Sequence, residues 1–119
     1  MRIELENRLI DFSVTINELV SCFKRNILTQ NLSQQIIRSS TSAALNFGEA
    51  QSAESRKDFI HKMSIVLKEL RETFVCLKII HRSKLYKNEE KIIKAKKESN
   101  ELISIFVKSI ETAQKNQKS

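Results

Sequence analysis

One pair of residues in this chain has the spacing of a metal-binding motif. Asp58 and His61 stand three residues apart, as an acidic-x-x-His sequence. A di-metal site in a helical bundle needs two such motifs and a further glutamate from each of two helices. The second histidine, His81, has Lys78 three residues before it and supplies no second motif. The sequence therefore predicts no metal and no other cofactor, with His61 as a partly exposed helix residue or a partner contact.

The candidate nucleophiles have no partner that would activate them. Cys22 and Cys76 lie in apolar stretches, where burial raises the pKa of a thiol and makes it inert. We expect two buried free thiols, with a structural disulfide or a reactive thiol as the alternatives. The serines within residues 39–42 have no base that the sequence identifies. We therefore expect no enzyme and no small-molecule substrate; the alternative is a hydrolase or nuclease that uses Glu49 or Asp58.

Positive charge is concentrated in the second half of the chain. The whole chain has 21 lysines and arginines against 14 aspartates and glutamates, a formal net charge of +7. Residues 1–20 carry two basic and four acidic residues, whereas residues 55–84 carry eight basic and three acidic ones. Residues 85–97 add five lysines and two glutamates. Basic stripes of this kind bind nucleic-acid phosphates without reading the base sequence, and their binding weakens steeply with salt.

The residues predicted to bind nucleic acid form a Lys/Arg-rich face on the second half of the chain. They are Arg56, Lys57, Lys68, Arg71, Lys78, Arg82, Lys84, Lys87, Lys91, Lys94 and Lys97. Tyr86 is the single tyrosine and the aromatic residue near this stretch that could stack on a base. The expected contacts are therefore to the backbone of RNA or DNA. The alternative is a solvated face that keeps the protein in solution.

Three polar residues of the second predicted helix share one broad face. Arg38 and Asn46 stand eight residues apart, and Asn46 and Glu49 stand three apart. Turns of about 100° per residue bring such positions to the same side of a helix. We expect a polar network within the bundle or between copies of the chain. Contact with a ligand or with RNA is the alternative.

The near absence of turn residues predicts an all-α protein. The chain has no proline and one glycine, and sheets and long loops depend on these residues for their turns. The apolar pattern predicts a first helix with Lys24 and Arg25 in its last turn, where cations suit the helix dipole. A polar break at residues 29–31 follows. Asn31 is then the predicted N-cap of a second helix over residues 32–51.

Two further helices are predicted from their caps. Ser55 and Asp58 form an S-x-x-D capping pattern before the third helix, and Asn88 caps a fourth that ends near Gln114. Residues 1–114 are predicted to form one domain, and residues 115–119 a frayed tail. The apolar positions predicted to face the core are Leu5, Leu9, Phe12, Ile16, Leu19, Phe23, Leu32, Ile36, Ala43, Phe47, Ala50, Phe59, Met63, Val66, Leu70, Phe74, Leu77, Ile92, Ala95, Leu102, Phe106 and Ile110.

Short connectors between helices of similar length predict an antiparallel, up-down-up-down four-helix bundle. The first and last helices also carry a second apolar stripe beside the core positions. It consists of Ile10, Val14 and Val20 on the first helix and Ile103, Val107 and Ile110 on the last. A solitary bundle needs one apolar stripe per helix, so we expect the second stripes to be buried against other copies of the chain.

The sequence gives no sign of export or of membrane insertion. No apolar run approaches the roughly 18 residues of a membrane span. The first residues, Met1 to Glu4, alternate charged and apolar side chains and do not resemble a signal peptide. We therefore expect a cytoplasmic protein without a membrane partner.

The segment from Gln34 to Ile80 resembles a known family. It is similar to the bacterial four-helix-bundle proteins encoded within intervening sequences of the large-subunit ribosomal RNA gene. The chain departs from the family at Cys76, where a tryptophan is common, and at Gly48. The positions that carry the resemblance are Gln35, Arg38, Ser39, Thr41, Ser42, Asn46, Glu49, Ala53, Glu54, Ser55, Asp58, Phe59, Ile60, His61, Lys62, Lys68, Glu69, Glu72 and Thr73.

The resemblance implies a four-helix bundle assembled as a ring, typically a pentamer. One related branch is the accessory variability protein of diversity-generating retroelements, which binds a reverse transcriptase and nucleic acid through a basic surface. The function expected for this chain is therefore that of a non-enzymatic homo-oligomeric bundle. Its Lys/Arg-rich face would bind RNA, DNA or a nucleic-acid enzyme such as a reverse transcriptase. The alternative is a protein-interaction or scaffolding bundle whose charge is incidental.

Overall fold

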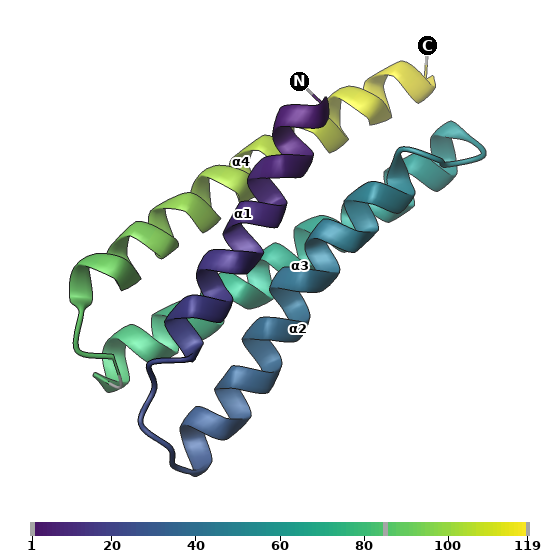
Figure 1. Ribbon diagram of the computed structural model, residues 1–119. Helices are drawn as coiled ribbons and strands as arrows, with labels where there is room; N and C mark the ends of the chain where they lie inside the picture. Colours follow the sequence, from purple (N-terminus) through teal and green to yellow (C-terminus); the bar gives the residue numbers. More distant parts are fainter. Residues whose placement is uncertain (1, 85, 119) are drawn as a thin grey trace.

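Four helices and their connectors make up the computed structural model, which describes residues 2–84 and 86–118 (Figure 1). The helices are α1 (Arg2–Val20), α2 (Ile27–Ala50), α3 (Arg56–Ser83) and α4 (Glu89–Lys118). The described residues contain no strand. The predicted all-α class is confirmed. None of the helices in this part of the chain has a stretch that is long and apolar enough to cross a membrane.

Helix α2 begins earlier than the sequence analysis predicted. Asn26, not Asn31, is its N-cap, and the predicted break at residues 29–31 lies inside the helix. The reason is a reciprocal capping box, in which the Thr29 amide donates to Asn26 Oδ1 and the Asn26 amide donates to Thr29 Oγ1, both at 2.8 Å. Because α1 ends at Val20, Lys24 and Arg25 lie in the α1–α2 connector and not in the last turn of a helix.

The caps of the last two helices agree with the sequence. The Asp58 amide donates to Ser55 Oγ at 3.0 Å, and the Lys91 amide donates to Asn88 Oδ1 at 3.3 Å. Helix α3 ends at Ser83, and its C-cap, Lys84, has a left-handed backbone conformation with φ of 57°. Helix α4 continues to Lys118, beyond the predicted end near Gln114. Ser119, the last residue of the predicted tail, lies outside the described residues.

The predicted apolar positions form the core. Nearly all are buried, and Leu5, Phe23, Phe59 and Phe74 are half-buried. At the α2–α3 contact the neighbour of Phe74 in the sequence, Thr73, is buried in place of the phenylalanine. The Thr73 hydroxyl lies 2.7 Å from Ser39 Oγ. Phe74 turns outward instead, with Lys78 Nζ 4.8 Å from its ring centre. A polar pair thus occupies a core layer for which apolar periodicity predicted a phenylalanine.

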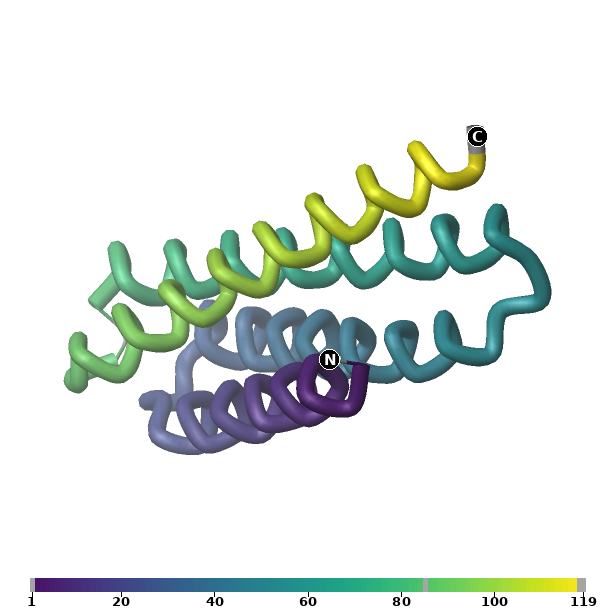
Figure 2. The backbone as a smooth tube through the Cα atoms, turned by 90° about the horizontal axis from the view of Figure 1, so that it is seen from above, coloured from purple at the N-terminus to yellow at the C-terminus, as the bar shows by residue number. Residues whose placement is uncertain are grey.

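Helix α1 packs on α2 over a longer stretch than on α4, while α3 packs closely on both α2 and α4. Figure 2 shows α1 leaning away from α4 along the bundle, whose extents are 51 × 21 × 20 Å. The α1–α2 and α3–α4 connectors lie at one end, and the α2–α3 connector lies at the other (Figures 1 and 2). The α1–α2 and α3–α4 connectors, which are far apart in the sequence, therefore lie close together at the same end of the bundle.

The predicted second apolar stripes differ in exposure. On α1, Ile10 and Val14 are 45% and 52% exposed and are free to meet another surface, whereas Val20 is half-buried against the core of its own bundle. On α4, Ile103 and Val107 are half-buried, and Ile110 belongs to the core of its own bundle. The exposed stripe is consequently confined to α1.

Ser99→Ala is expected to stabilise the fold by about 1 kcal/mol. Ser99 is fully buried on α4, and its hydroxyl has no hydrogen-bond partner among the described residues. Removing an unsatisfied hydroxyl recovers its desolvation cost. Urea denaturation measures the change. Ser104→Ala is the matched control on the same helix, because that serine is exposed. If both substitutions raise the stability equally, the gain comes from the higher helix propensity of alanine and not from removal of a buried, unsatisfied hydroxyl.

Candidate nucleic-acid interface

The structure divides the eleven predicted basic residues among several surfaces. Lys68 and Arg71 line a groove between α2 and α3, whereas Lys91, Lys94 and Lys97 line a cleft between α4 and α1. The remaining six lie along α3 or beside the α3–α4 connector. Arg56 and Lys57 open α3 at the far end of the bundle, Lys78 lies over Phe74, Arg82 is in the last turn of α3, and Lys84 and Lys87 flank the α3–α4 connector.

Four lysines meet where the α1–α2 and α3–α4 connectors lie side by side. Lys24, Lys84 and Lys87 line a hollow of about 470 Å³, and Lys91 follows in the first turn of α4. We call these four residues the connector-end lysines. Tyr86 lines this hollow and also the neighbouring cleft that contains Lys91. The site therefore combines cations from three segments with one aromatic ring.

The connector-end lysines form no short ion pair, although Glu89 and Glu90 lie in the first turn of α4 beside Lys87 and Lys91 in the sequence. All four are exposed, and none forms an ion pair within 4.0 Å with a carboxylate of residues 2–84 or 86–118. The other residues that line the hollow, Cys22, Asn26 and Asn88, carry no carboxylate. A cluster in which cations outnumber anions at one end of a molecule attracts polyanions.

Sequence reasoning missed Lys24 as a member of this site. The apolar pattern extended the first helix to Phe23 and placed Lys24 in its last turn. The Asn26–Thr29 capping box instead ends the connector, and the Thr29 hydroxyl donates to the Lys24 carbonyl oxygen at 2.6 Å. That hydrogen bond holds the backbone of Lys24 against the start of α2. Recognising this cap in the sequence would have placed Lys24 in the α1–α2 connector, but not beside Lys84 and Lys87.

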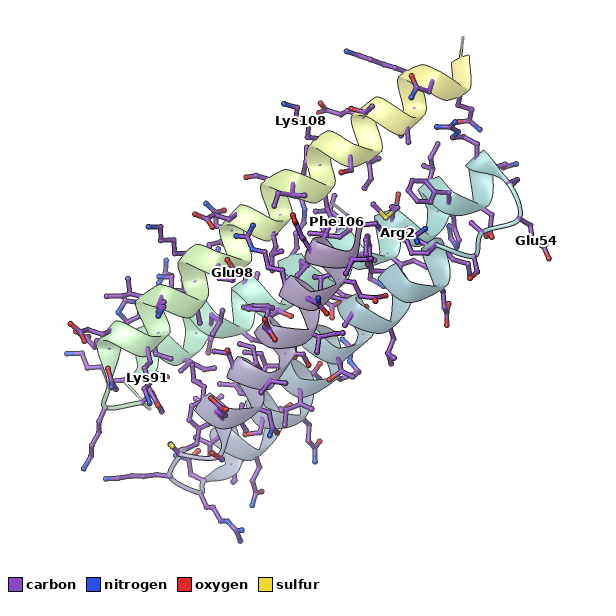
Figure 3. The ribbon with its side chains drawn as sticks, turned by 45° about the horizontal axis from the view of Figure 1, so that its top comes forward. Arg2, Glu54, Lys91, Glu98, Phe106 and Lys108 are labelled. Atoms are coloured by element: carbon purple, nitrogen blue, oxygen red, sulfur yellow. The ribbon has the colours of Figure 1, made fainter. Side chains whose placement is uncertain are left out.

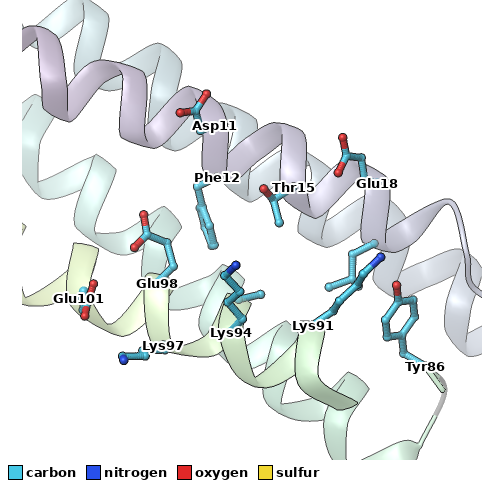
Figure 4. A pocket seen from close by; sticks show the side chains of 12 residues that line it. Asp11, Phe12, Thr15, Glu18, Tyr86, Lys91, Lys94, Lys97, Glu98 and Glu101 are labelled. Carbon is cyan, nitrogen blue, oxygen red and sulfur yellow. The ribbon is translucent and has the colours of Figure 1, made fainter. Parts of the chain in front are cut away.

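The cleft between α1 and α4 has a volume of about 580 Å³ and an apolar floor formed by Phe12, Leu19 and Ala95. Its α1 wall is acidic, and its α4 wall carries Lys91, Lys94 and Lys97 beside Glu98 and Glu101. Figure 4 shows Asp11 and Glu18 on the α1 side, and Lys91 and Lys94 on the α4 side. The acidic wall was not predicted. The α4 lysines thus border a cleft that contains both positive and negative charges. Their charge adds to that of the connector-end lysines only at the end of the cleft where Lys91 lies.

Arg8 joins the two walls of the cleft at its other end. Its guanidinium donates to Glu98 at 2.8 and 2.6 Å and to Glu101 at 2.6 Å. The hydrogen bond to Glu98 is the main reason why the pKa of Arg8 is raised. Glu98 points from α4 toward α1 in Figures 3 and 4. Arg8 carries one positive charge against the two negative charges of Glu98 and Glu101, so this group keeps a net charge of −1 beside the lysines of α4.

The three polar residues of α2 do not form one network. Arg38 reaches α3, where it donates to Glu69 at 2.9 Å and also to Glu72, and the hydrogen bond to Glu72 raises the pKa of Arg38. Asn46 donates to the Ser42 carbonyl oxygen of its own helix at 2.8 Å. Glu49 separately lies 3.5 Å from Lys62 of α3. Arg38 and Glu49 therefore each contact α3, whereas the hydrogen bond of Asn46 stays within α2.

The candidate metal ligands are scattered. No group of three or more His, Cys, Asp or Glu side chains that could hold a metal ion occurs among the described residues. Asp58 belongs to the start of α3 and accepts a hydrogen bond from the Glu54 amide at 3.3 Å, while His61 is exposed. His81 lies near the end of α3, with Lys96 Nζ 3.2 Å from its Nδ1.

The cysteines are free thiols, but the prediction that both are buried is wrong. Cys22 is exposed in the α1–α2 connector, because α1 ends at Val20 and the chain turns outward there. Cys76 is half-buried on α3, and desolvation there raises the pKa of its thiol. The raised pKa of Cys76 is the opposite of the change that activates a thiol nucleophile.

The fold has been seen in another protein. A crystal structure of a protein of unknown function from the S23 ribosomal protein family of Bacteroides thetaiotaomicron VPI-5482 superposes with a TM-score of 0.78. It is 32% identical in sequence, and the match covers 89% of this chain and 97% of that one. A comparison with curated proteins finds no match. The family model of the 23S rRNA-intervening sequence proteins matches residues 2–108, and the chain belongs to this family.

Proposed function

We propose that this protein is a non-enzymatic, homo-oligomeric bundle that binds the backbone of nucleic acid through its connector-end lysines. The observation that supports the proposal is the convergence of Lys24, Lys84, Lys87 and Lys91 at one end of the bundle, where none of them forms a short ion pair with the described residues. Lysine ammonium groups bind phosphates as point charges and do not distinguish one base sequence from another. The proposed activity is therefore sequence-independent binding.

The oligomer in this proposal is a ring of up-down-up-down bundles, for which the resemblance suggests five subunits. The exposed residues Ile10 and Val14 on α1 supply an apolar stripe that a neighbouring copy would cover. A ring repeats the connector-end lysines once per subunit, so that several weak phosphate contacts act together. The expected compartment is the cytoplasm, where RNA, DNA and nucleic-acid enzymes such as a reverse transcriptase are all available as partners.

Salt dependence of binding tests the proposal. Fluorescence anisotropy of labelled RNA and DNA, as duplexes and as single strands, is measured against the purified protein over a salt series. Four phosphate contacts per subunit predict that log K falls with log salt with a slope of about −3.6 for a duplex. Absence of binding even at low salt would overturn the proposal. Light scattering on the same samples gives the subunit number, and a monomeric mass would overturn the oligomer.

A groove between α2 and α3 favours a second candidate, a protein-binding or scaffolding role. Its lining includes Val75 and Ile79, which are 48% and 41% exposed, beside Lys68 and Arg71. Exposed apolar residues with basic neighbours suit the docking of an acidic, amphipathic helix. Loss of partner binding on Val75→Ser with Ile79→Ser, with nucleic-acid affinity unchanged, would favour this candidate over the first.

A further inference from the structure

We propose that the α1–α4 cleft accepts one unpaired base, which stacks on Tyr86, so that the connector end prefers single-stranded nucleic acid to duplex. The inference rests on the proposed function and specifies its substrate class. Tyr86 is the residue that lines both the hollow of the connector-end lysines and the cleft. A strand whose phosphates lie on those lysines would therefore have a base beside the Tyr86 ring.

The Tyr86 ring is available for stacking and is held in place. It is half-buried, and it packs against Phe23 in an edge arrangement, with ring centres 6.0 Å apart and planes at 71°. In Figure 4 the ring lies at the mouth of the cleft next to Lys91. A ring fixed on one side and exposed on another loses little conformational entropy when a base stacks on it. Aromatic side chains in single-strand-binding proteins work in this way without selecting one base.

The cleft has the size and lining that a base requires. Its volume of about 580 Å³ lies in the range of small-ligand pockets and exceeds that of a nucleobase. The floor of Phe12, Leu19 and Ala95 is apolar, which suits the faces of a base. A duplex cannot use this space, because its bases are stacked and paired inside the helix. Only an unpaired base can be turned outward into the cleft.

The charges of the cleft orient such a strand. Asp11 and Glu18 on the α1 wall repel phosphates, which leaves the phosphates on the connector-end lysines. The same carboxylates can accept hydrogen bonds from the amino groups of adenine, cytosine or guanine, and these amino groups are free in a single strand. Lys91 lies between the two regions, next to Tyr86. The arrangement therefore separates phosphate contacts from base contacts.

The intrinsic fluorescence of Tyr86 tests the inference directly. The chain has one tyrosine and no tryptophan, so tyrosine emission reports on this ring alone in the unmodified protein. Titration with a single-stranded oligonucleotide is expected to quench the emission to saturation. An abasic strand with the same number of phosphates, and a duplex, are expected to bind without quenching. Free N-acetyltyrosinamide in the same titrations corrects for absorption by the nucleic acid.

Variants extend this test to affinity. Tyr86→Leu is expected to weaken binding of the single strand about tenfold, to leave the abasic strand and the salt slope unchanged, and to be rescued by Tyr86→Phe. Equal affinity of wild-type protein for single strand, abasic strand and duplex, without quenching, would overturn the inference and leave the proposed function intact. Failure of every nucleic acid to bind would instead overturn the proposed function. Circular dichroism confirms that the variants are folded.

Discussion

Charge reversal of the connector-end lysines is expected to lower the affinity for nucleic acid by about a thousandfold near 0.1 M salt. The change is Lys24, Lys84, Lys87 and Lys91 to glutamate. Each of these lysines, when it binds a phosphate, releases about one counterion, and four such contacts account for a factor of this size. The slope of log K against log salt should also become shallower, changing from about −3.6 toward zero. Anisotropy over a salt series measures both quantities.

The matched control reverses four exposed cations elsewhere on the bundle. Arg56 and Lys57 lie at the start of α3, and Lys108 and Lys115 lie on the second half of α4. This set is at the other end of the molecule, where Figure 3 shows Lys108 far from Lys91. The net charge changes by the same amount in both variants, so a purely global charge effect would weaken both equally. Wild-type affinity in the connector-end variant would contradict the proposed site.

Most of the fold could be predicted from the sequence because burial follows the helical period. Ile16, Ile36, Leu70 and Phe106 are fully or almost fully buried at the positions that the four-and-three spacing gave them. The start of α2 could not be predicted in this way. A run of polar residues can be either a break between helices or the N-cap of a helix. Only the reciprocal hydrogen bonds of Asn26 and Thr29 show that α2 begins at this point.

The candidate site was less predictable than the fold. The sequence identified Lys84, Lys87 and Lys91 from their charge, but charge alone does not say which helices lie next to them. Lys24 joins the site through the packing of two connectors, and the acidic wall of the cleft depends on how α1 approaches α4. Both are tertiary contacts between segments about sixty or more residues apart. A linear pattern of residue types contains no signal for them.

Loss of the Arg38 side chain is expected to cost about 2 kcal/mol of stability, because it leaves a buried carboxylate without its cation. The Glu69 side chain is 7% exposed, and Arg38 is its ion-pair partner at 2.9 Å. Arg38→Met removes that partner and keeps most of the apolar length of the side chain. Thermal and urea denaturation at one fixed protein concentration measure the change. We expect a lowering of Tm by roughly 4 °C for each kcal/mol lost.

Arg8→Met is the matched control, since Arg8 also pairs with two glutamates across a helix contact. Its partners Glu98 and Glu101 are 30% and 52% exposed, so water replaces the lost cation, and the cost should stay below about 1 kcal/mol. A second substitution, Glu69→Met in the Arg38→Met background, should restore most of the stability because no buried charge remains. Equal losses for the two arginines, or no recovery in the double variant, would show that Arg38 acts through packing and not by neutralising Glu69.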